Sequence, residues 1–351
     1  MINVGVAGIG FMGWIHYLAY EKVESARITA IASRSPKKLA GDWTGIQGNF
    51  GPPGRQVDLN GIKTYSNLDE LLEDTEIDLI DNCLPPHLHA DFSIRALEAG
   101  KHVLCEKPMA LLSADCDRMV ATAERVGKQI LVGHVLPFFP EYAFARKVAE
   151  SGEYGRLVGG NFKRIIADPL WLDDFFDADR VGGPLVDLHV HDAHFIRMMF
   201  GMPTTLFSQG RLRGDVVEHC STLFGFSDPQ LAVTATSGVI NQQGRDFTHA
   251  YELHFEKATL HFDFAAFKDA AELMPLKILP ADASEPEAMV LRPDLGDGDP
   301  VGAFVAEIEE VVRSLEANAA SPILSGVLAR DAIHLCHKQT ESVKRRTQVG
   351  V

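Results

Sequence analysis

The sequence predicts an α/β domain built on a doubly wound parallel sheet, followed by an α+β domain with a large, mostly antiparallel sheet. Three observations support this fold class. The 351 residues exceed the usual size of one hydrophobic core. Strand-like and helix-like runs alternate up to Gly133, and mainly strand-like runs follow. We therefore expect one domain over 1–133 and a second over 134–351.

The first predicted strand ends in glycines. The apolar run INVGVAGIG precedes FMGWIHYLAYEKV, which has helical spacing, so Gly8, Gly10 and Gly13 form a G-x-G-x-x-G pattern between strand and helix. Such glycines permit a tight turn, close approach of a pyrophosphate, and close packing of helix on strand. The pattern predicts a dinucleotide site with Phe11 and Met12 as further contacts. A purely structural turn is the alternative.

The second predicted strand, RITAIAS, ends where a dinucleotide-binding domain usually presents an acid to the adenosine ribose. This chain has Ser33 and Arg34 there, with Lys38 close behind. An acid would repel a 2′-phosphate, whereas arginine can hold phosphate with two hydrogen bonds. The sequence therefore favours NADP, with NAD possible, and an ordinary solvated loop is the alternative.

The rest of the first domain continues the alternation. Asn67 and Glu70 have the spacing of a capping box at the start of a helix, and Gly100 ends a later one. The remaining predicted strands and helices are IDLIDNCLPP, HADFSIRALEAG, KHVLCEKP, SADCDRMVATAERVG and QILVGH. Residues 41–61 are rich in Gly and Pro without a period, so we expect an extended loop near the adenine end and assign it no function.

The second half reads as strands separated by turn residues. The runs are GRLVGGNFKRII, TTLFSQGRLRG, CSTLFGFSD, LAVTATSGVI and AYELHFEKATLHFDF.

Composition excludes several classes of protein. A net charge of −15 argues against a nucleic-acid surface. The cysteines show no C-x-x-C pair and an odd count, which favours reduced thiols in a cytoplasmic protein; they are Cys83, Cys105, Cys116, Cys220 and Cys336. No signal peptide and no apolar run of membrane-spanning length is visible.

Five segments carry a resemblance to a known family. They are GVAGIGFMG, NCLPPHLHA, GKHVLCEKPMA, VGHVLPFFPEY and GGPLVDLHVHDAHFIRMMFG. In this order they resemble the glucose-fructose oxidoreductase / inositol dehydrogenase / MocA (Gfo/Idh/MocA) family, through nearly the whole chain to ESVKRRTQV, which is similar to the family's last helix and strand. The resemblance implies a Rossmann domain, a large open sheet that often forms homodimers or homotetramers, and oxidation or reduction of a sugar, polyol or related cyclic compound.

The resemblance places the family's catalytic residues at Lys107, Asp187 and His191. Chemistry supports these roles, because removing hydride from a secondary alcohol requires a base for the hydroxyl proton, and histidine titrates near neutral pH. An ammonium group stabilises the developing alkoxide, and an aspartate orients the imidazole or holds the sugar. A surface cation at a strand end is the alternative for Lys107. Further cofactor contacts are expected from Leu84, Pro85, His87, Glu106 and Lys107.

The stretch DLHVHDAHF contains three histidines. In a regular helix Asp187, His191 and His194 would share one face, which could bind a metal, but no H-E-x-x-H and no cysteine pair accompanies them. We therefore expect no metal. His189 is left open between a pocket hydrogen bond and packing.

Two positions depart from the family pattern and put the substrate in doubt. His194 stands where many members have a second aspartate, and Pro137 where many have an arginine. Candidate substrate contacts are His134, His194 and Trp171, with core packing as the alternative for Trp171. Two other functions stay open. One is an enzyme that retains its dinucleotide and uses transient oxidation for elimination or glycoside cleavage, and the other is a non-catalytic NADP sensor.

Overall fold

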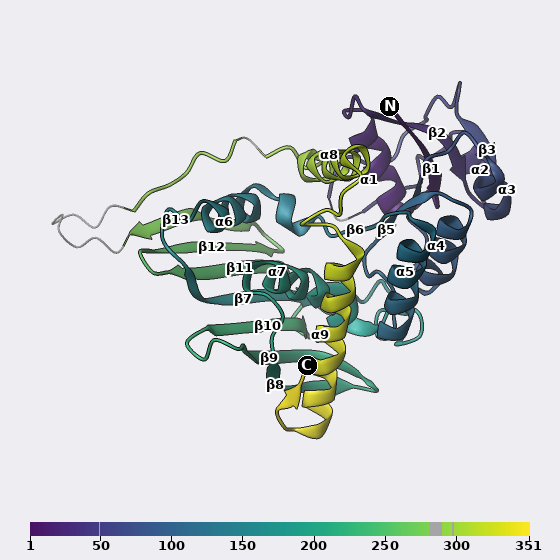
Figure 1. Cartoon of the computed structure of the whole chain (residues 1–351). Coiled ribbons are helices and arrows are strands. Elements are labelled where there is room, and N and C mark those ends of the chain that lie inside the picture. The colour runs from purple at the N-terminus through teal and green to yellow at the C-terminus, as the bar shows by residue number, and fades with distance from the viewer. Residues whose placement is uncertain (49, 281–289, 297) are drawn as a thin grey trace. The chain divides into compact units, whose positions relative to one another are not determined.

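The computed structural model describes residues 1–48, 50–280, 290–296 and 298–351. The chain divides into two compact units, the first made of Met1–Phe139 with Gly298–Arg330, the second of Pro140–Asp297 with Asp331–Val351. The elements of both are labelled in Figure 1. Among the helices of the described residues, none has the length and apolar character that a bilayer span requires.

The first unit contains a six-stranded parallel sheet in the order β3-β2-β1-β4-β5-β6 (Figure 1). Its strands are β1 Ile2–Ala7, β2 Ala26–Ala32, β3 Lys63–Tyr65, β4 Leu79–Asn82, β5 His102–Glu106 and β6 Ile130–Gly133. The order reverses between β1 and β4, and ligands of doubly wound sheets bind at the carboxyl ends of the strands beside this reversal. The predicted doubly wound fold is confirmed.

Burial explains why these runs form central strands. Val4 and Val6 of β1 and Val103 and Leu104 of β5 are completely buried, as expected when helices cover both faces of a parallel sheet. The helices of this unit are α1 Phe11–Tyr20, α2 Pro36–Leu39, α3 Leu68–Glu73, α4 His89–Glu98, α5 Ser113–Val126 and α8 Gly302–Ala317. The predicted cap is confirmed, because Asn67 accepts a hydrogen bond from the Asp69 N–H at 2.9 Å.

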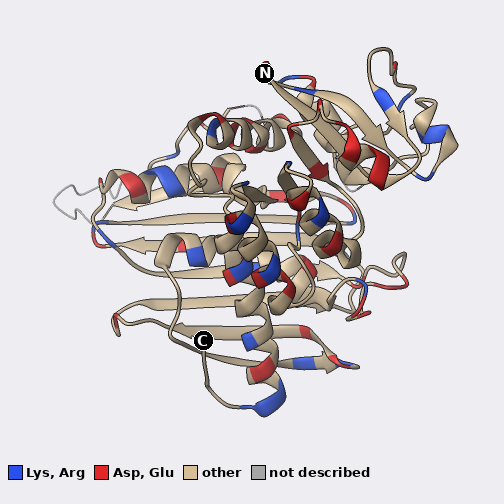
Figure 2. Ribbon diagram, turned by 45° about the vertical axis from the view of Figure 1, so that its right-hand side comes forward, with Lys and Arg blue, Asp and Glu red and all other residues tan. Residues whose placement is uncertain are grey.

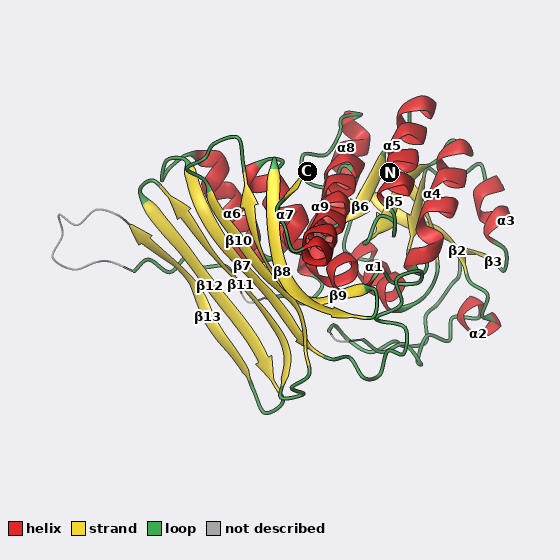
Figure 3. Cartoon of the chain, turned by 90° about the horizontal axis from the view of Figure 1, so that it is seen from below, coloured by secondary structure: helices red, strands yellow, loops and turns green. Residues whose placement is uncertain are grey.

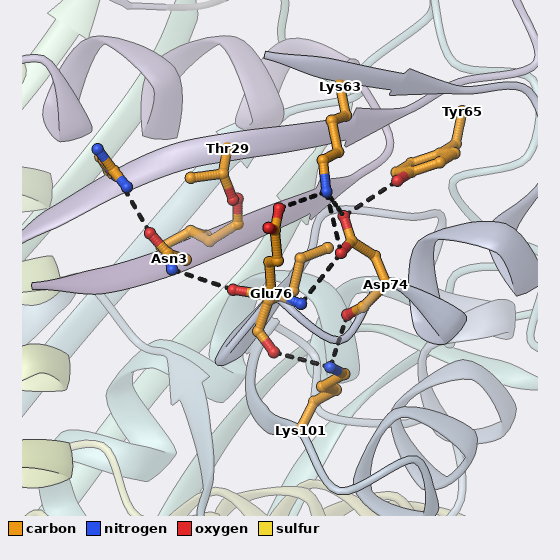
Figure 4. Close-up of polar contacts among 10 residues, drawn as sticks. Asn3, Thr29, Lys63, Tyr65, Asp74, Glu76 and Lys101 are labelled. Atoms are coloured by element: carbon orange, nitrogen blue, oxygen red, sulfur yellow. Dashed lines mark hydrogen bonds and ion pairs between the residues drawn. The ribbon is translucent and has the colours of Figure 1, made fainter. Parts of the chain in front are cut away.

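Polar side chains pair with one another at the amino ends of the parallel strands (Figure 4). The Lys63 ammonium lies 3.0 Å from a carboxylate oxygen of Asp74 and 2.5 Å from one of Glu76. Lys101 donates to the backbone carbonyls of Asp74 and Ile77 at 2.7 and 2.8 Å. These contacts join the starts of β3 and β5 to the segment before β4, so they stabilise the amino end of the sheet.

The second unit contains an eight-stranded sheet in the order β13-β12-β11-β7-β10-β9-β8-β14. Its strands are β7 Leu157–Ala167, β8 Thr205–Arg213, β9 Val216–Gly225, β10 Ala232–Ile240, β11 Arg245–Phe255, β12 Ala258–Phe267, β13 Ala271–Pro280 and β14 Val349–Gly350. Only β7 and β10 pair in parallel, and the other neighbours are antiparallel. The predicted large, mostly antiparallel sheet is confirmed.

Helices cover one face of this sheet (Figure 3). They are α6 Pro140–Ser151, α7 Val190–Phe200 and the part of α9, Gly326–Arg345, that follows Arg330. Tyr142 of α6 anchors the layer, since its ring lies 5.1 Å from that of Phe195 and 5.0 Å from that of Tyr251. Among the described residues of this unit, no helix lies on the opposite face of the sheet (Figure 3).

Two features of the first unit were not predicted. In the Gly/Pro-rich segment, Trp43 packs against α1, where it is 1% exposed and its ring lies 4.9 Å from that of Tyr17. The segment Gly298–Arg330 rejoins the first unit after the large sheet and contributes α8. The Phe304 ring of α8 lies 6.1 Å from the His16 ring of α1. Helix α8 therefore packs against α1, although the two are far apart in the sequence.

Candidate active site

The three glycines after β1 are needed for different reasons. Gly8 has a φ of +95°, and a Cβ there would lie 2.8 Å from the Cys83 carbonyl oxygen. A Cβ on Gly13 would lie 2.3 Å from the Gly8 carbonyl oxygen. A Cβ on Gly10, the N-cap of α1, would meet no described atom within 4 Å. The fold therefore requires Gly8 and Gly13, whereas the space at Gly10 suits the close approach of a phosphate to the helix N-terminus.

Phe11 and Met12 begin α1 directly after this turn. The Phe11 ring lies 4.9 Å from the Phe50 ring, which stacks on Phe304 of α8 at 5.5 Å. Phe11 is therefore held by two segments distant in sequence. Sequence patterns did not predict this aromatic cluster, because Phe50 lies in a loop without a period and Phe304 in a helix that was not predicted.

The basic residues after β2 lie close to the glycine turn. The Lys38 ammonium donates a hydrogen bond to the carbonyl oxygen of Ile9, inside that turn. The Ser33 hydroxyl accepts from the Ser35 N–H at 3.2 Å. Arg34 is exposed and makes no ion pair with any residue that the structure describes. The end of β2 thus presents one hydroxyl and two cations beside the turn, and it presents no carboxylate of its own.

The loops after β4 and β5 are tied together by a residue that the sequence analysis did not single out. His89 is buried, with Nε2 2.6 Å from the Leu84 carbonyl oxygen and Nδ1 2.8 Å from the Pro108 carbonyl oxygen. Burial lowers the pKa of His89. Pro85 and His87, the latter in the short helix η1 Pro86–Leu88, are exposed beside it. The only sequence signal for His89 was its place in the PPHLHA segment.

Lys107 follows β5 and is half-buried. Its backbone N–H donates to Oε2 of Glu106 at 3.1 Å, and Glu106 itself is only 4% exposed. His134 follows β6 and is fully buried, and Pro137 lies in η2 Leu136–Phe138. Lys107 therefore stands at the carboxyl end of the parallel sheet, as the strand pattern predicted.

In the second unit, Asp187 and His191 come from a helix that begins irregularly. Leu185–His189 form a π-helical turn, η3, which continues into α7. Asp187 and His191 are half-buried, whereas His194 is fully buried. Of these three, only Asp187 lies in the π-helical turn, whereas His191 and His194 keep the regular three-residue spacing in α7. Such turns are frequent at functional sites.

His189 is a buried hydrogen-bonding residue. Its Nε2 lies 2.9 Å from the Gln339 amide nitrogen of α9, which also donates to Thr222 at 2.8 Å. Burial lowers the pKa of His189 to about 4, so the imidazole is neutral and accepts from that amide. The neighbouring Asp192 makes a buried ion pair with Arg164 of β7 at 2.7 Å. These contacts attach the start of α7 to the sheet.

Trp171 is 65% exposed, which excludes the alternative that it packs in a core of the described residues. The histidines of 187–195 form no group of metal ligands among the described residues. The group that could hold an ion lies in the first unit and consists of His16, Asp81 and Cys83.

Comparisons with known proteins decide the family. Residues 2–134 match the model described as "Oxidoreductase family, NAD-binding Rossmann fold", and residues 142–261 match the "GFO/IDH/MocA C-terminal domain". The chain belongs to the Gfo/Idh/MocA family. It is therefore an NAD(P)-dependent oxidoreductase, in a family whose named members act on sugars and polyols.

The individual relatives are distant. An oxidoreductase of Rhizobium meliloti is 38% identical over 140 residues, which span 39% of this chain and 41% of that protein. The dTDP-3,4-didehydro-2,6-dideoxy-alpha-D-glucose 3-reductase of Streptomyces violaceoruber is 27% identical over 89% of this chain and 85% of its own length. A levoglucosan dehydrogenase structure in complex with NADH aligns over 100% of this chain and 99% of that chain, with a TM-score of 0.81 at 22% identity, which shows a shared fold.

Proposed function

We propose that the chain is an NADP-preferring oxidoreductase that interconverts a hydroxyl and a carbonyl on a sugar, polyol or related cyclic compound. The observation that carries the proposal is the geometry of the first unit. The open space at Gly10 and the half-buried Lys107 both lie at the carboxyl ends of its parallel strands.

In the proposed reaction the bound dinucleotide supplies the hydride acceptor. His191 accepts the hydroxyl proton as general base, and returns it in the reverse direction. The Lys107 ammonium donates a hydrogen bond to the same oxygen and stabilises it as it becomes an alkoxide. Asp187 orients the imidazole or holds the substrate. The proposal requires Lys107 of the first unit and His191 of the second to meet at one substrate oxygen.

The surrounding contacts are part of the same proposal. Pro85 and His87 would lie along the nicotinamide ribose, with Leu84 and Glu106 beside them. His134, Trp171 and His194 would contact the substrate. A cyclic polyol or sugar is supported by the names of two relatives, the inositol 2-dehydrogenase 2 of Saccharopolyspora erythraea, 31% identical over 159 residues, and the levoglucosan dehydrogenase of Pseudarthrobacter phenanthrenivorans, 26% identical over 301 residues.

The catalytic assignment is tested with two lysine variants. Lys107→Ala should lower kcat by about a hundredfold or more while dinucleotide affinity changes little, because a group that acts on the transition state is lost. Lys63→Ala, at the amino end of the same sheet, is the matched control and should leave kcat unchanged. Turnover is followed by reduced-nicotinamide absorbance over a panel of sugars and polyols. Wild-type turnover by Lys107→Ala would refute the assignment.

The preference for NADP rests on the residues after β2. Ser33 replaces an acid, Arg34 is exposed, and Lys38 lies beside the glycine turn. Arg34→Ala should weaken NADP binding by about tenfold and leave NAD binding nearly unchanged, since one cation facing a phosphate contributes about 1–2 kcal/mol. Arg118→Ala on α5 is the control. Equal losses for both dinucleotides, measured by titration calorimetry, would contradict the preference.

A second candidate is an enzyme that keeps its dinucleotide bound and uses transient oxidation for elimination or glycoside cleavage. It is supported by a relative named 2,7-anhydro-N-acetylneuraminate hydratase from Escherichia coli, 27% identical over 238 residues. Dinucleotide that co-purifies with the chain, with no net change in its redox state during turnover, would favour this candidate. A non-catalytic NADP sensor is disfavoured, because a sensor needs no set such as Lys107, Asp187 and His191.

We propose that the chain is a cytoplasmic homodimer or homotetramer that associates through the open sheet face. The strands of the large sheet carry few charged residues in Figure 2, and Phe207 and Leu223 are 40% and 54% exposed. The five cysteines are all free, as in a reducing compartment. Sedimentation should show the oligomer, and Leu223→Asp should dissociate it. A monomeric wild-type chain would contradict the assembly.

A further inference from the structure

A cluster of ionisable side chains is enclosed in the first unit, next to the residue that precedes Lys107. It comprises His16 of α1, Asp81 of β4, Glu106 of β5 and Glu307 of α8. The first, second and fourth are completely buried, and Glu106 is 4% exposed. We call these four residues the buried acid cluster. Unpaired buried charges are strongly unfavourable. The three carboxyl groups and the imidazole must therefore share their protons so that few charges stay unpaired.

One half of the buried acid cluster is an imidazole held between two carboxyl groups. His16 Nδ1 lies 2.8 Å from an Asp81 oxygen, and His16 Nε2 lies 3.0 Å from Oε1 of Glu106. Burial, the largest single influence, would lower the pKa of His16, but Asp81 and Cys83 together raise that pKa well above the usual value. His16 is therefore protonated, with Nδ1 hydrogen-bonded to Asp81 and Nε2 within ion-pair distance of Glu106.

The other half of the buried acid cluster is the Glu307 carboxyl group, which has no hydrogen-bond partner among the described residues. Both oxygens of Glu307 are buried and accept no hydrogen bond from the described residues. A Cβ placed on Gly133 would lie 3.0 Å from Oε1 of Glu106 and 3.3 Å from Oε1 of Glu307, so the two oxygens approach the same point. Burial and repulsion by Glu106 raise the pKa of Glu307 well above its usual value.

We propose that the buried acid cluster is a proton-binding site, in which Glu307 retains a proton and donates it to Oε1 of Glu106. This one proton supplies a partner for both glutamates. Glu106 then accepts from Glu307 at Oε1 and from the Lys107 N–H at Oε2, with the His16 imidazole 3.0 Å away, so its carboxylate fixes the backbone that carries Lys107. His16 and Glu307 are thereby positioning residues for Lys107. This last step rests on the proposed function, whereas the proton site does not.

The groups around the buried acid cluster leave it with one net negative charge. Asp81 acts electrostatically on the buried Tyr20 of α1, and Cys83 donates its S–H to Asp81 at 3.3 Å. Burial raises the pKa of both the phenol and the thiol, so neither adds an anion near neutral pH. On the Glu106 side, Lys107 is the next residue in the chain, and Cys105 and His89 also interact with Glu106. Burial raises the pKa of the Cys105 thiol and lowers that of His89.

A metal ion is the competing occupant. His16, Asp81 and Cys83 offer ligand atoms within 4.8 Å of one another. A metal would bind the Cys83 thiolate and would take His16 Nδ1 from the Asp81 oxygen that it already contacts. It would also leave Glu307 without a partner, since Glu307 is not part of that group. The proton gives Glu307 and Oε1 of Glu106 each other as partners, which a metal at His16, Asp81 and Cys83 would not.

Infrared spectroscopy of the full chain tests the proton directly. At about pH 8, where an ordinary glutamate is ionised, the wild-type protein should show the C=O stretch of a protonated carboxyl group, with a shift in D₂O. Glu307→Gln should remove this band. Glu310→Gln on the same helix, whose carboxylate pairs with Arg313, should retain it. A wild type without the band, a band that survives Glu307→Gln, or stoichiometric metal that Cys83→Ser removes would overturn the proposal.

Kinetics test the link to Lys107. Glu307→Gln keeps an N–H that can donate to Glu106, so its kcat should stay within about threefold of wild type. Glu307→Leu removes the donor and should lower kcat by about tenfold, with the dinucleotide KM unchanged. Equal losses in both variants would overturn the positioning role. If Lys107→Ala shows that Lys107 has no role in turnover, the infrared band still decides the proton site.

Discussion

The two ends of the parallel sheet differ in how their polar side chains are exposed to water. At the amino end, Lys63 and Glu76 are exposed, and Asp74 pairs with Lys63 within hydrogen-bonding distance (Figure 4). At the carboxyl end, Glu106 and Glu307 are withdrawn from water. Exposed pairs of this kind serve stability alone, and their loss is tolerated. Buried acids destabilise a fold unless they are paired or protonated, and groups with perturbed pKa values often cluster at functional sites.

The largest effect should come from a methyl group at Gly13. Gly13→Ala would place a Cβ 2.3 Å from the Gly8 carbonyl oxygen, so the turn or α1 must move. We expect destabilisation by several kcal/mol, about 3 or more, together with loss of dinucleotide binding. Thermal melting and dinucleotide titration check both. Gly45→Ala, where a Cβ meets nothing within 4 Å, is the control and should behave as wild type. A stable Gly13→Ala protein with full affinity would contradict this account of the turn.

Gly10→Ala separates binding from folding at the same turn. A Cβ there meets no described atom within 4 Å, so the melting temperature should change little. The methyl group would occupy the space left for the pyrophosphate, and dinucleotide affinity should fall by about tenfold to a hundredfold. Unchanged affinity in this variant would mean that the dinucleotide does not approach the Gly10 backbone.

The amino end should show the reverse behaviour. Lys101 is 7% exposed and donates to two backbone carbonyls, so Lys101→Met should lower the free energy of unfolding by about 1–3 kcal/mol. Dinucleotide affinity and kcat should stay at wild-type values, because these contacts lie away from the crevice. Urea unfolding and steady-state kinetics measure the two outcomes. A loss of dinucleotide affinity together with stability would contradict the idea that only the carboxyl end of the sheet serves binding.

The smallest effect is a pH dependence of stability that originates in the carboxyl end. The folded-state pKa values of His16 and Glu307 are raised above their unfolded values, so the folded chain binds more protons. Their contribution is complete below the unfolded pKa values, about 4.5 for Glu307 and 6.5 for His16, and is lost as pH rises through the folded values. In Glu307→Gln, the free energy of unfolding, measured with urea, should fall less steeply as pH rises. A decline as steep as that of wild type would show that Glu307 is ionised when folded.

Sequence patterns predicted the features that depend on neighbouring residues. The period of apolar residues gave β1 and α1, the spacing of Gly8 and Gly13 gave the turn, and Asn67 gave a helix start. Features formed by distant residues had no such signal. Gln339 donates a hydrogen bond to His189 across 150 positions, and the π-helical turn that carries Asp187 had no signal in the sequence.

The buried acid cluster illustrates the same limit. Asp81 and Glu106 lie in runs that read as buried strands, and Glu307 lies in α8, which the sequence analysis did not predict. No local pattern shows that three carboxyl groups from elements so distant in sequence meet at one imidazole. The sequence could therefore predict that Lys107 stands at the carboxyl end of the sheet, but not the cluster of buried acids beside it.

The most direct test of the account is a crystal structure of the chain with NADP and a substrate found in the activity panel. We predict that the Lys107 ammonium and a ring nitrogen of His191 both lie within hydrogen-bonding distance of one substrate oxygen, beside the nicotinamide ring. Nitrogens that face different cavities, or a metal ion seated between the histidines of 187–195, would contradict it.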